Sequence, residues 1–245
     1  MLLLIACTAK TPPEPAPQTA PEPEAEAVAA GPTTTERWPS VVDLDGEPVL
    51  ASWDDGDTFS SPREDQDPMR ARLSGYNTLE SYGPVHRWGD WDAAELYLLS
   101  KEAGQLAGSK VWECYDTGHG GGYGRSQVDC PELRQELLRR GLAHSFVMDG
   151  EALPDDLAAQ QEAIRSGAGM WARGTPEWLT TSIHSKGEGK DRTYNRVVST
   201  ADGHSEERTH EETYEPCSEV CPVDSCMIYV PYAQRYGDDR AVCLR

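Results

Sequence analysis

Residues 41–59 read VVDLDGEPVLASWDDGDTF, and two Asp-Gly pairs interrupt their hydrophobic runs. The stretches 41–44 and 48–53 are rich in Val, Leu and Trp, which favours short β-strands. The dipeptides Asp45-Gly46 and Asp55-Gly56 are typical of the tight turns that join such strands. We therefore expect the globular part of the chain to begin with short strands joined by tight turns.

Further patterns extend this β-rich start into a mixed fold. Three more strands are predicted, at 58–59, 69–73 and 111–115. The apolar spacing predicts a helix at 91–106, and two later helices begin at Pro131 and after Pro154, before glycines at 141 and 167. Strands followed by a helix, a hairpin and two helices predict an α+β fold, a small antiparallel β-barrel with helices packed against it.

Composition and charge exclude two classes of protein. The chain has 245 residues, with 22 basic and 42 acidic side chains, and its formal charge is -20. No apolar run approaches the roughly 18 residues of a membrane-spanning helix, which excludes a polytopic membrane protein. Residues 38–184 hold 12 basic and 25 acidic side chains, which excludes a broadly basic nucleic-acid coat. Such a body repels polyanions, although salt screens this repulsion over about 8 Å.

The first seven residues, MLLLIAC, suggest a lipoprotein signal. Leu4-Ile5-Ala6-Cys7 fits a bacterial lipobox, so we expect Cys7 to be acylated and 1–7 to be a truncated signal whose true start lies upstream. The alternative is a short apolar start with an incidental cysteine. Residues 8–37 are rich in Pro, Glu and Ala and predict a disordered tether. We expect an exported protein, lipid-anchored to the bacterial outer membrane or cell surface.

Six cysteines remain after Cys7, and an even number in an exported chain indicates disulfides. Fifteen pairings are open for Cys114, Cys130, Cys217, Cys221, Cys226 and Cys243. Zinc binding by the last four is the alternative, which an oxidising compartment disfavours. Residues 185–245 form a charge-rich linker, with one strand expected at 194–199, and a Cys-rich segment. That segment is too small for a hydrophobic core of its own. Disulfides must therefore hold it together, or it must pack against the main domain.

Three short motifs carry the candidate chemistry. They are DDGDTF at 54–59, RLSGYNTLE at 72–80 and YGR at 123–125. Each alone is ordinary, but together they supply oxygen ligands for a hard cation, two guanidinium groups and a carboxylate base. A divalent cation and bidentate arginines stabilise the negative charge of phosphodiester hydrolysis. A carboxylate beside a water molecule acts as general base, which contributes about 10²–10⁴-fold.

These motifs, in this order, resemble the staphylococcal-nuclease (thermonuclease) family. The resemblance runs from Val49 to about Trp178, half of the chain, and its landmarks are 55–59, 72–73, 77–80, 82–84, 123–125, 137–143 and 167–171. It implies an OB-fold, a five-stranded barrel with three helices, over a domain at 38–184. It also implies Ca²⁺-dependent hydrolysis of DNA or RNA by a protein that we expect to be a monomer.

The resemblance also assigns the calcium ligands. Asp57 and the Thr78 carbonyl would bind the ion, Asp55 would lie in its outer shell, and Asn77 would offer an amide oxygen where the family usually has Asp. The amide lacks the carboxylate charge, so we expect weaker calcium binding than in the family.

The catalytic residues follow from the same resemblance. Glu80 would be the general base, Arg72 and Arg125 would bind the scissile phosphate, and Tyr123 would donate a hydrogen bond to a phosphate oxygen. Leu79 replaces the family's proline, which releases a backbone restraint next to Glu80. No tyrosine follows Ala143 to stack on a base.

Three functions therefore stay open. The first is a surface-tethered nuclease. The second is a weak or inactive module of the same fold that binds or supports the cell envelope. In the third, the Cys-rich tail carries the function and the barrel is its scaffold, because sites rather than folds set function.

Overall fold

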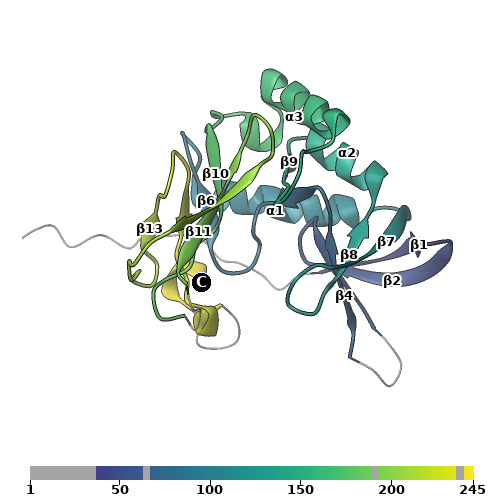
Figure 1. Ribbon diagram of the computed structural model, residues 1–245, viewed down its shortest axis with the longest axis horizontal. Helices are drawn as coiled ribbons and strands as arrows, with labels where there is room; N and C mark the ends of the chain where they lie inside the picture. The colour runs from purple at the N-terminus through teal and green to yellow at the C-terminus, as the bar shows by residue number, and fades with distance from the viewer. Residues whose placement is uncertain (1–36, 63–66, 189–191, 236–239) are drawn as a thin grey trace, which may run out of the picture.

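The computed structural model describes residues 37–62, 67–188, 192–235 and 240–245, so Cys7 and residues 8–36 of the expected tether lie outside the described residues. The fold is α+β, as predicted, with a closed β-barrel, three α-helices and smaller sheets. In Figure 1 the barrel strands lie on one side of the molecule and the C-terminal strands on the other, with α2 and α3 along one edge. Within the described ranges, no helix is long and apolar enough to cross a bilayer.

The described part of the barrel has six strands in the order β1-β2-β3-β4-β8-β7. They are β1 (Trp38–Leu44), β2 (Glu47–Trp53), β3 (Thr58–Ser61), β4 (Met69–Leu73), β7 (Trp112–Gly120) and β8 (Ser126–Asp129). The strands β1 to β4 form an antiparallel meander, and β7 and β8 form an antiparallel hairpin. Parallel pairing of β1 with β7 and of β4 with β8 closes the barrel.

The predicted five-stranded, antiparallel barrel is therefore wrong in two respects. The barrel has six strands because the short strand β8, of four residues, is paired along both edges, with β7 on one side and β4 on the other. Pairing on both edges satisfies backbone groups that an open barrel would expose at β4. The two parallel pairings join strands that are distant in sequence, and local patterns do not specify such partners.

The three predicted helices are confirmed. They are α1 (Ala93–Ala107), α2 (Pro131–Arg139) and α3 (Pro154–Ser166). A capping box between Asp92 and Glu95 begins α1, and prolines occupy the first turns of α2 and α3. Leu133 and Leu137 on α2 are fully buried in the cluster that fills the barrel, so this helix seals the barrel end.

The C-terminal half adds strands to elements of the body. One sheet joins β10 (Trp178–Ser182), β11 (Tyr194–Ser199) and β12 (Ser205–Thr209), and a second joins β13 (Glu219–Val220), β14 (Cys226–Ile228) and β6 (Val85–Arg87). The expected strand at 194–199 is confirmed as β11, whereas β12 was not predicted. A short pair of β5 (Tyr76–Thr78) and β9 (Ala143–Ser145) lies beside the barrel. The remaining elements are the 3₁₀ turns η1 (Gly169–Trp171), η2 (Tyr232–Gln234) and η3 (Val242–Leu244).

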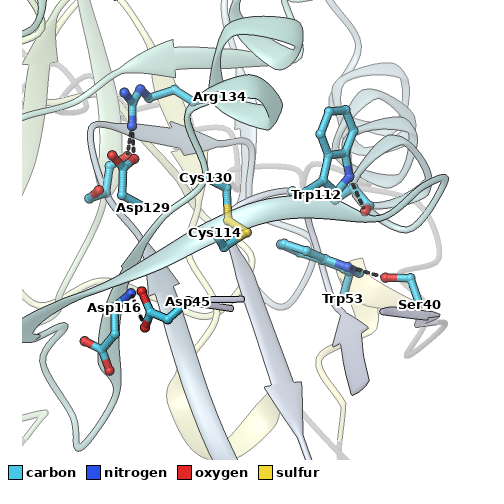
Figure 2. The surroundings of a disulfide bond; sticks show 12 residues. Ser40, Asp45, Trp53, Trp112, Cys114, Asp116, Asp129, Cys130 and Arg134 are labelled. Carbon is cyan, nitrogen blue, oxygen red and sulfur yellow. Dashed lines mark hydrogen bonds and ion pairs between the residues drawn. A yellow bond between two sulfur atoms is a disulfide. The ribbon is translucent and has the colours of Figure 1, made fainter. Parts of the chain in front are cut away.

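All six predicted cysteines form disulfides. The pairs are Cys114–Cys130, Cys217–Cys243 and Cys221–Cys226. Figure 2 shows the first pair joining β7 to the start of α2, beside the buried rings of Trp53 and Trp112. None of these cysteines is left as a thiolate, so the zinc alternative does not hold for them.

Candidate active site

The turn after β2 is held in place by residues of β4 and β5. The Tyr76 hydroxyl donates a 2.7 Å hydrogen bond to the Gly56 carbonyl, and the Leu73 amide donates a 2.8 Å bond to the Asp57 carbonyl. A Cβ at Gly56 would lie 2.7 Å from the Thr78 Cγ2 atom, so only glycine allows this close approach. The turn therefore presents Asp57 directly beside Thr78.

Asp57 is the centre of the polar network. Its Oδ2 accepts a 2.9 Å hydrogen bond from the Thr78 amide, and its Oδ1 accepts one of 2.9 Å from the Thr58 hydroxyl. The Arg72 guanidinium forms an ion pair with Asp57 through one nitrogen and donates to the Asn77 Oδ1 through another. Asp57 is 3% exposed, so this ion pair is largely withdrawn from water.

Two further carboxyls lie in the field of this pair. Burial raises the pKa of Asp55 well above its ordinary value, and the charges of Asp57 and Glu80 raise it further. Burial, followed by the charge of Asp57, raises the pKa of half-buried Glu80 to about 7, although nearby arginines including Arg72 oppose the shift. A carboxyl with a pKa near 7 is suited to proton transfer at neutral pH.

The β7–β8 hairpin brings Arg125 toward the same place. A Cβ at Gly121 would lie 2.9 Å from the Arg72 Cβ and 3.5 Å from the Arg125 Cβ, so this glycine separates the stems of the two arginines. The positive charge of Arg125 lowers the pKa of Glu80. Its Nε donates to the Gly122 carbonyl at 3.2 Å, and no carboxylate of the described residues forms an ion pair with it. Tyr123, at the hairpin tip, is 79% exposed.

The structure thus brings together all the candidate ligand and catalytic residues except Tyr123, whose exposed ring lies against Arg125 with 5.8 Å between ring centroid and guanidinium carbon. Leu79 is buried, and its side chain packs with Trp88 and Leu96. Packing of this leucine restrains the backbone next to Glu80, which the sequence alone led us to expect to be less restrained.

Three other residues near the site carried no sequence signal. His144 is buried on β9, opposite Asn77 in the β5–β9 register, and burial lowers its pKa to about 4. His86 is buried on β6, and burial lowers its pKa to about 3. Arg235, in the Cys-rich segment, lowers the pKa of Glu80 through its charge. Only tertiary contacts place these residues beside the motifs.

The donors fit a hard cation. Asp57 and Asn77 offer carboxylate and amide oxygens close enough to share one guanidinium, and the buried Thr78 Oγ1 has no hydrogen-bond partner in the described part. No three carboxylates of the described residues converge here, since the only cluster of three His, Cys, Asp or Glu ligand atoms is Glu219 with the disulfide-bonded Cys221 and Cys226. A cation at Asp57 and Asn77 would compete with Arg72 for the same oxygens.

Comparison with known proteins gives no assignment: neither models of protein families nor curated proteins match this chain. The candidate site therefore has to be judged on its own geometry.

Proposed function

We propose that this protein is a Ca²⁺-dependent nuclease that hydrolyses phosphodiesters of DNA or RNA, with a thermonuclease-like OB-fold barrel. The observation that carries the proposal is the convergence of Asp57, Arg72, Glu80 and Arg125, which come from four separate segments. The β3–β4 pairing brings Asp57 to Arg72, and the parallel pairing of β4 with β8 that closes the barrel brings the hairpin of Arg125 to them. Burying the charged side chains of such a cluster costs desolvation free energy, and clusters that bear this cost are typical of functional sites.

Each residue then has a chemical task. Glu80, with its pKa near neutrality, would accept a proton from the attacking water. Arg125 would bind phosphate oxygens, and Arg72 would do the same at the inner end of the site. Calcium held by Asp57, Asn77 and the Thr78 carbonyl would supply positive charge that stabilises the developing negative charge. Tyr123, which is exposed at the hairpin tip, would contact the bound strand.

A direct assay tests this function. The full chain is incubated with plasmid DNA and with RNA, in calcium and in EDTA. We expect calcium-dependent cleavage that falls by about 10²-fold or more in Glu80→Gln. Glu151→Gln, on an exposed residue between β9 and α3, is the matched control and should cleave like the wild type. Cleavage that is no faster than in Glu80→Gln would rule out the nuclease.

One observation favours the alternative of a catalytically weak or inactive module. Arg72 already satisfies both Asp57 and Asn77, so the network is complete without an ion. An inactive module would show no rise in melting temperature with calcium, whereas a folded calcium site is stabilised by mass action. A clear thermal shift with calcium would count against the inactive module.

We also propose that a lipid on Cys7 holds the protein at the outer membrane or cell surface. Three disulfides support export, because such bonds persist in oxidising compartments. Metabolic labelling with a fatty acid should label the wild type and not Cys7→Ser. Equal labelling of both proteins would show that Cys7 does not carry the lipid.

A further inference from the structure

The C-terminal segment places a third arginine next to the candidate site. Arg235 follows η2 and is half-buried, and its Nε donates a 3.0 Å hydrogen bond to the carbonyl of buried Val230. The Ala241 amide donates a 3.1 Å bond back to the Gln234 carbonyl. One of these hydrogen bonds holds the Arg235 side chain, and the other holds the backbone of the preceding residue.

The stem of Arg235 lies on the backbone of Gly83. A Cβ at Gly83 would lie 2.6 Å from the Arg235 Cδ, 2.8 Å from its Cγ and 3.0 Å from its Nε. Gly83 is three residues beyond Glu80, and its φ of +87° is one that glycine adopts readily. The absence of a side chain at position 83 therefore lets the arginine approach the loop that carries Glu80.

Two features keep the segment docked on this loop. Strand β14 pairs with β6, with Ile228 opposite Val85, only five residues after Glu80. The Cys217–Cys243 disulfide encloses the Arg235 turn, and both of its cysteines are buried in one cluster with Val85 and Val230. The position of Arg235 relative to Glu80 is therefore built into the fold.

The charge of Arg235 is available to a ligand. None of the described carboxylates forms an ion pair with it, and the one hydrogen bond of its side chain in the described part uses Nε. Its charge nevertheless acts on Glu80, together with those of Arg72 and Arg125. Arg72 is already paired with Asp57, so Arg125 and Arg235 are the two guanidinium groups here that can bind an anion.

We propose that Arg235 is a third phosphate-binding residue of this site, so that the disulfide-bonded C-terminal segment completes the site instead of standing apart from it. The ligand class is a nucleic-acid strand, whose successive phosphates Arg235 and Arg125 would bind. The proposal rests on the proposed nuclease function for its catalytic consequence, but not for phosphate binding itself.

The test separates binding from cleavage. Binding of a short fluorescein-labelled oligothymidine is measured by anisotropy in EDTA over a series of salt concentrations. Cleavage of DNA is measured in calcium. The variants are Arg235→Gln, Arg235→Lys and the matched control Arg165→Gln, which removes an equal charge from the exposed end of α3. Circular dichroism of each variant establishes that it is folded.

We expect Arg235→Gln to bind the oligonucleotide about tenfold more weakly and to lose about 0.7 from the slope of log affinity against log salt. Its kcat/KM should fall, because one contact to the phosphate backbone is lost. Arg235→Lys should keep the salt slope but recover only part of kcat/KM, since lysine lacks the bidentate fork. Arg165→Gln should match the wild type.

The outcomes distinguish the two proposals. If the wild type cleaves DNA and Arg235→Gln equals it in affinity, salt slope and kcat/KM, Arg235 has no role and the nuclease stands. If the wild type binds but does not cleave, the nuclease fails, while weaker binding by Arg235→Gln still supports the phosphate site. A wild type that neither binds nor cleaves overturns both.

Discussion

At the scale of single residues, the chemistry of the site depends on how Arg72 is shared between Asp57 and Asn77. The guanidinium contributes one positive charge and Asp57 one negative charge, while the Asn77 amide contributes none. The pair is thus close to neutral, which weakens its attraction for a divalent cation. A second carboxylate at position 77 would restore a net negative charge.

Asn77→Asp should therefore strengthen calcium binding by about tenfold, which is about 1.4 kcal/mol. The expected result is a larger calcium-induced rise in melting temperature than in the wild type, measured by differential scanning fluorimetry against EDTA. Magnesium at the same concentration serves as the control for general ionic effects. An equal or smaller calcium shift would show that position 77 is not a ligand.

The titration of Glu80 sets the expected pH dependence. Its pKa is raised to about 7, and a general base acts only in its ionised form, so kcat/KM should rise with pH through about 7. In Glu80→Gln the remaining activity should lack this rise. If kcat/KM of the variant still rises with pH near pH 7, the titrating group is not Glu80.

At the scale of elements, β5 and the loop after it aim Glu80 through the packing of Leu79. This side chain is 1% exposed and shares a cluster with Trp88, Leu96 and Trp171. Burial of the leucine therefore restrains the backbone next to Glu80.

Leu79→Ala should lower the free energy of unfolding by about 2–5 kcal/mol, because it leaves a cavity in this cluster. Cleavage measured below the melting temperature should fall as well, since Glu80 loses its support. Leu98→Ala is the control on α1, where Leu98 is 63% exposed and truncation should change stability by less than about 0.5 kcal/mol. Similar losses in both variants would contradict the argument.

The β7–β8 hairpin positions Arg125, and a disulfide closes its base. Cys114 and Cys130 are separated by 16 residues, and both are buried under α2. Figure 2 also shows Asp129, next to Cys130, paired with Arg134 of α2. The hairpin is therefore tied to the helix at its base while its tip stays exposed.

Replacing Cys114 and Cys130 together by alanine should cost about 3 kcal/mol of unfolding free energy, as expected for a loop of this length. Urea titration of the variant and the wild type measures the loss. The comparison is the double variant Cys221→Ala, Cys226→Ala. Its missing disulfide closes a loop of only five residues, so its loss of unfolding free energy should be smaller. The reverse order would contradict a loop-entropy origin.

At the scale of the whole molecule, the C-terminal strands and the barrel body are joined across β6 and β14. His86 lies in this junction opposite Met227, and its side chain is buried. Burial lowers its pKa to about 3 from an ordinary 6.5, and the nearby His144 adds to the shift. The junction therefore accepts only a neutral imidazole.

This burial makes stability depend on pH. Below pH 6.5 the unfolded chain binds a proton at His86 that the folded protein does not bind until about pH 3, so its contribution is lost as pH falls through this window. The loss is up to about 1.4 kcal/mol per pH unit. His86→Leu should unfold with a correspondingly shallower pH dependence between pH 6 and 4, measured by urea titration. If the unfolding free energies of variant and wild type depend on pH in the same way, the pKa of His86 is not lowered by burial.

Local sequence patterns predicted the helices and the strands of the barrel meander, because these depend on near neighbours. Apolar spacing located all three helices, and the prolines at 131 and 154 marked two of their starts. The same patterns missed several short strands beside and after the barrel, among them β12, whose residues Ser205–Thr209 are almost all exposed and carry no apolar alternation. They also did not show that β8 joins the barrel through partners on both edges.

Sequence patterns likewise indicated some residues of the candidate site and missed others. Motif order alone singled out Asp57, Arg72, Glu80 and Arg125, because their residue types and spacing suit one kind of chemistry. No pattern marked Arg235, which stands in the Cys-rich segment, 155 residues beyond Glu80.

The amino-acid sequence determined the helices, the strands of the barrel meander, the cysteines that pair and the side chains capable of the proposed chemistry, since these follow from local propensity and side-chain type. The tertiary structure alone decided which cysteine meets which, how the barrel closes, and that Arg72 binds Asp57 and Asn77 at once. The physical reason is that pairing across long separations is chosen by the burial and hydrogen bonding of the whole chain together, and no single segment contains that information.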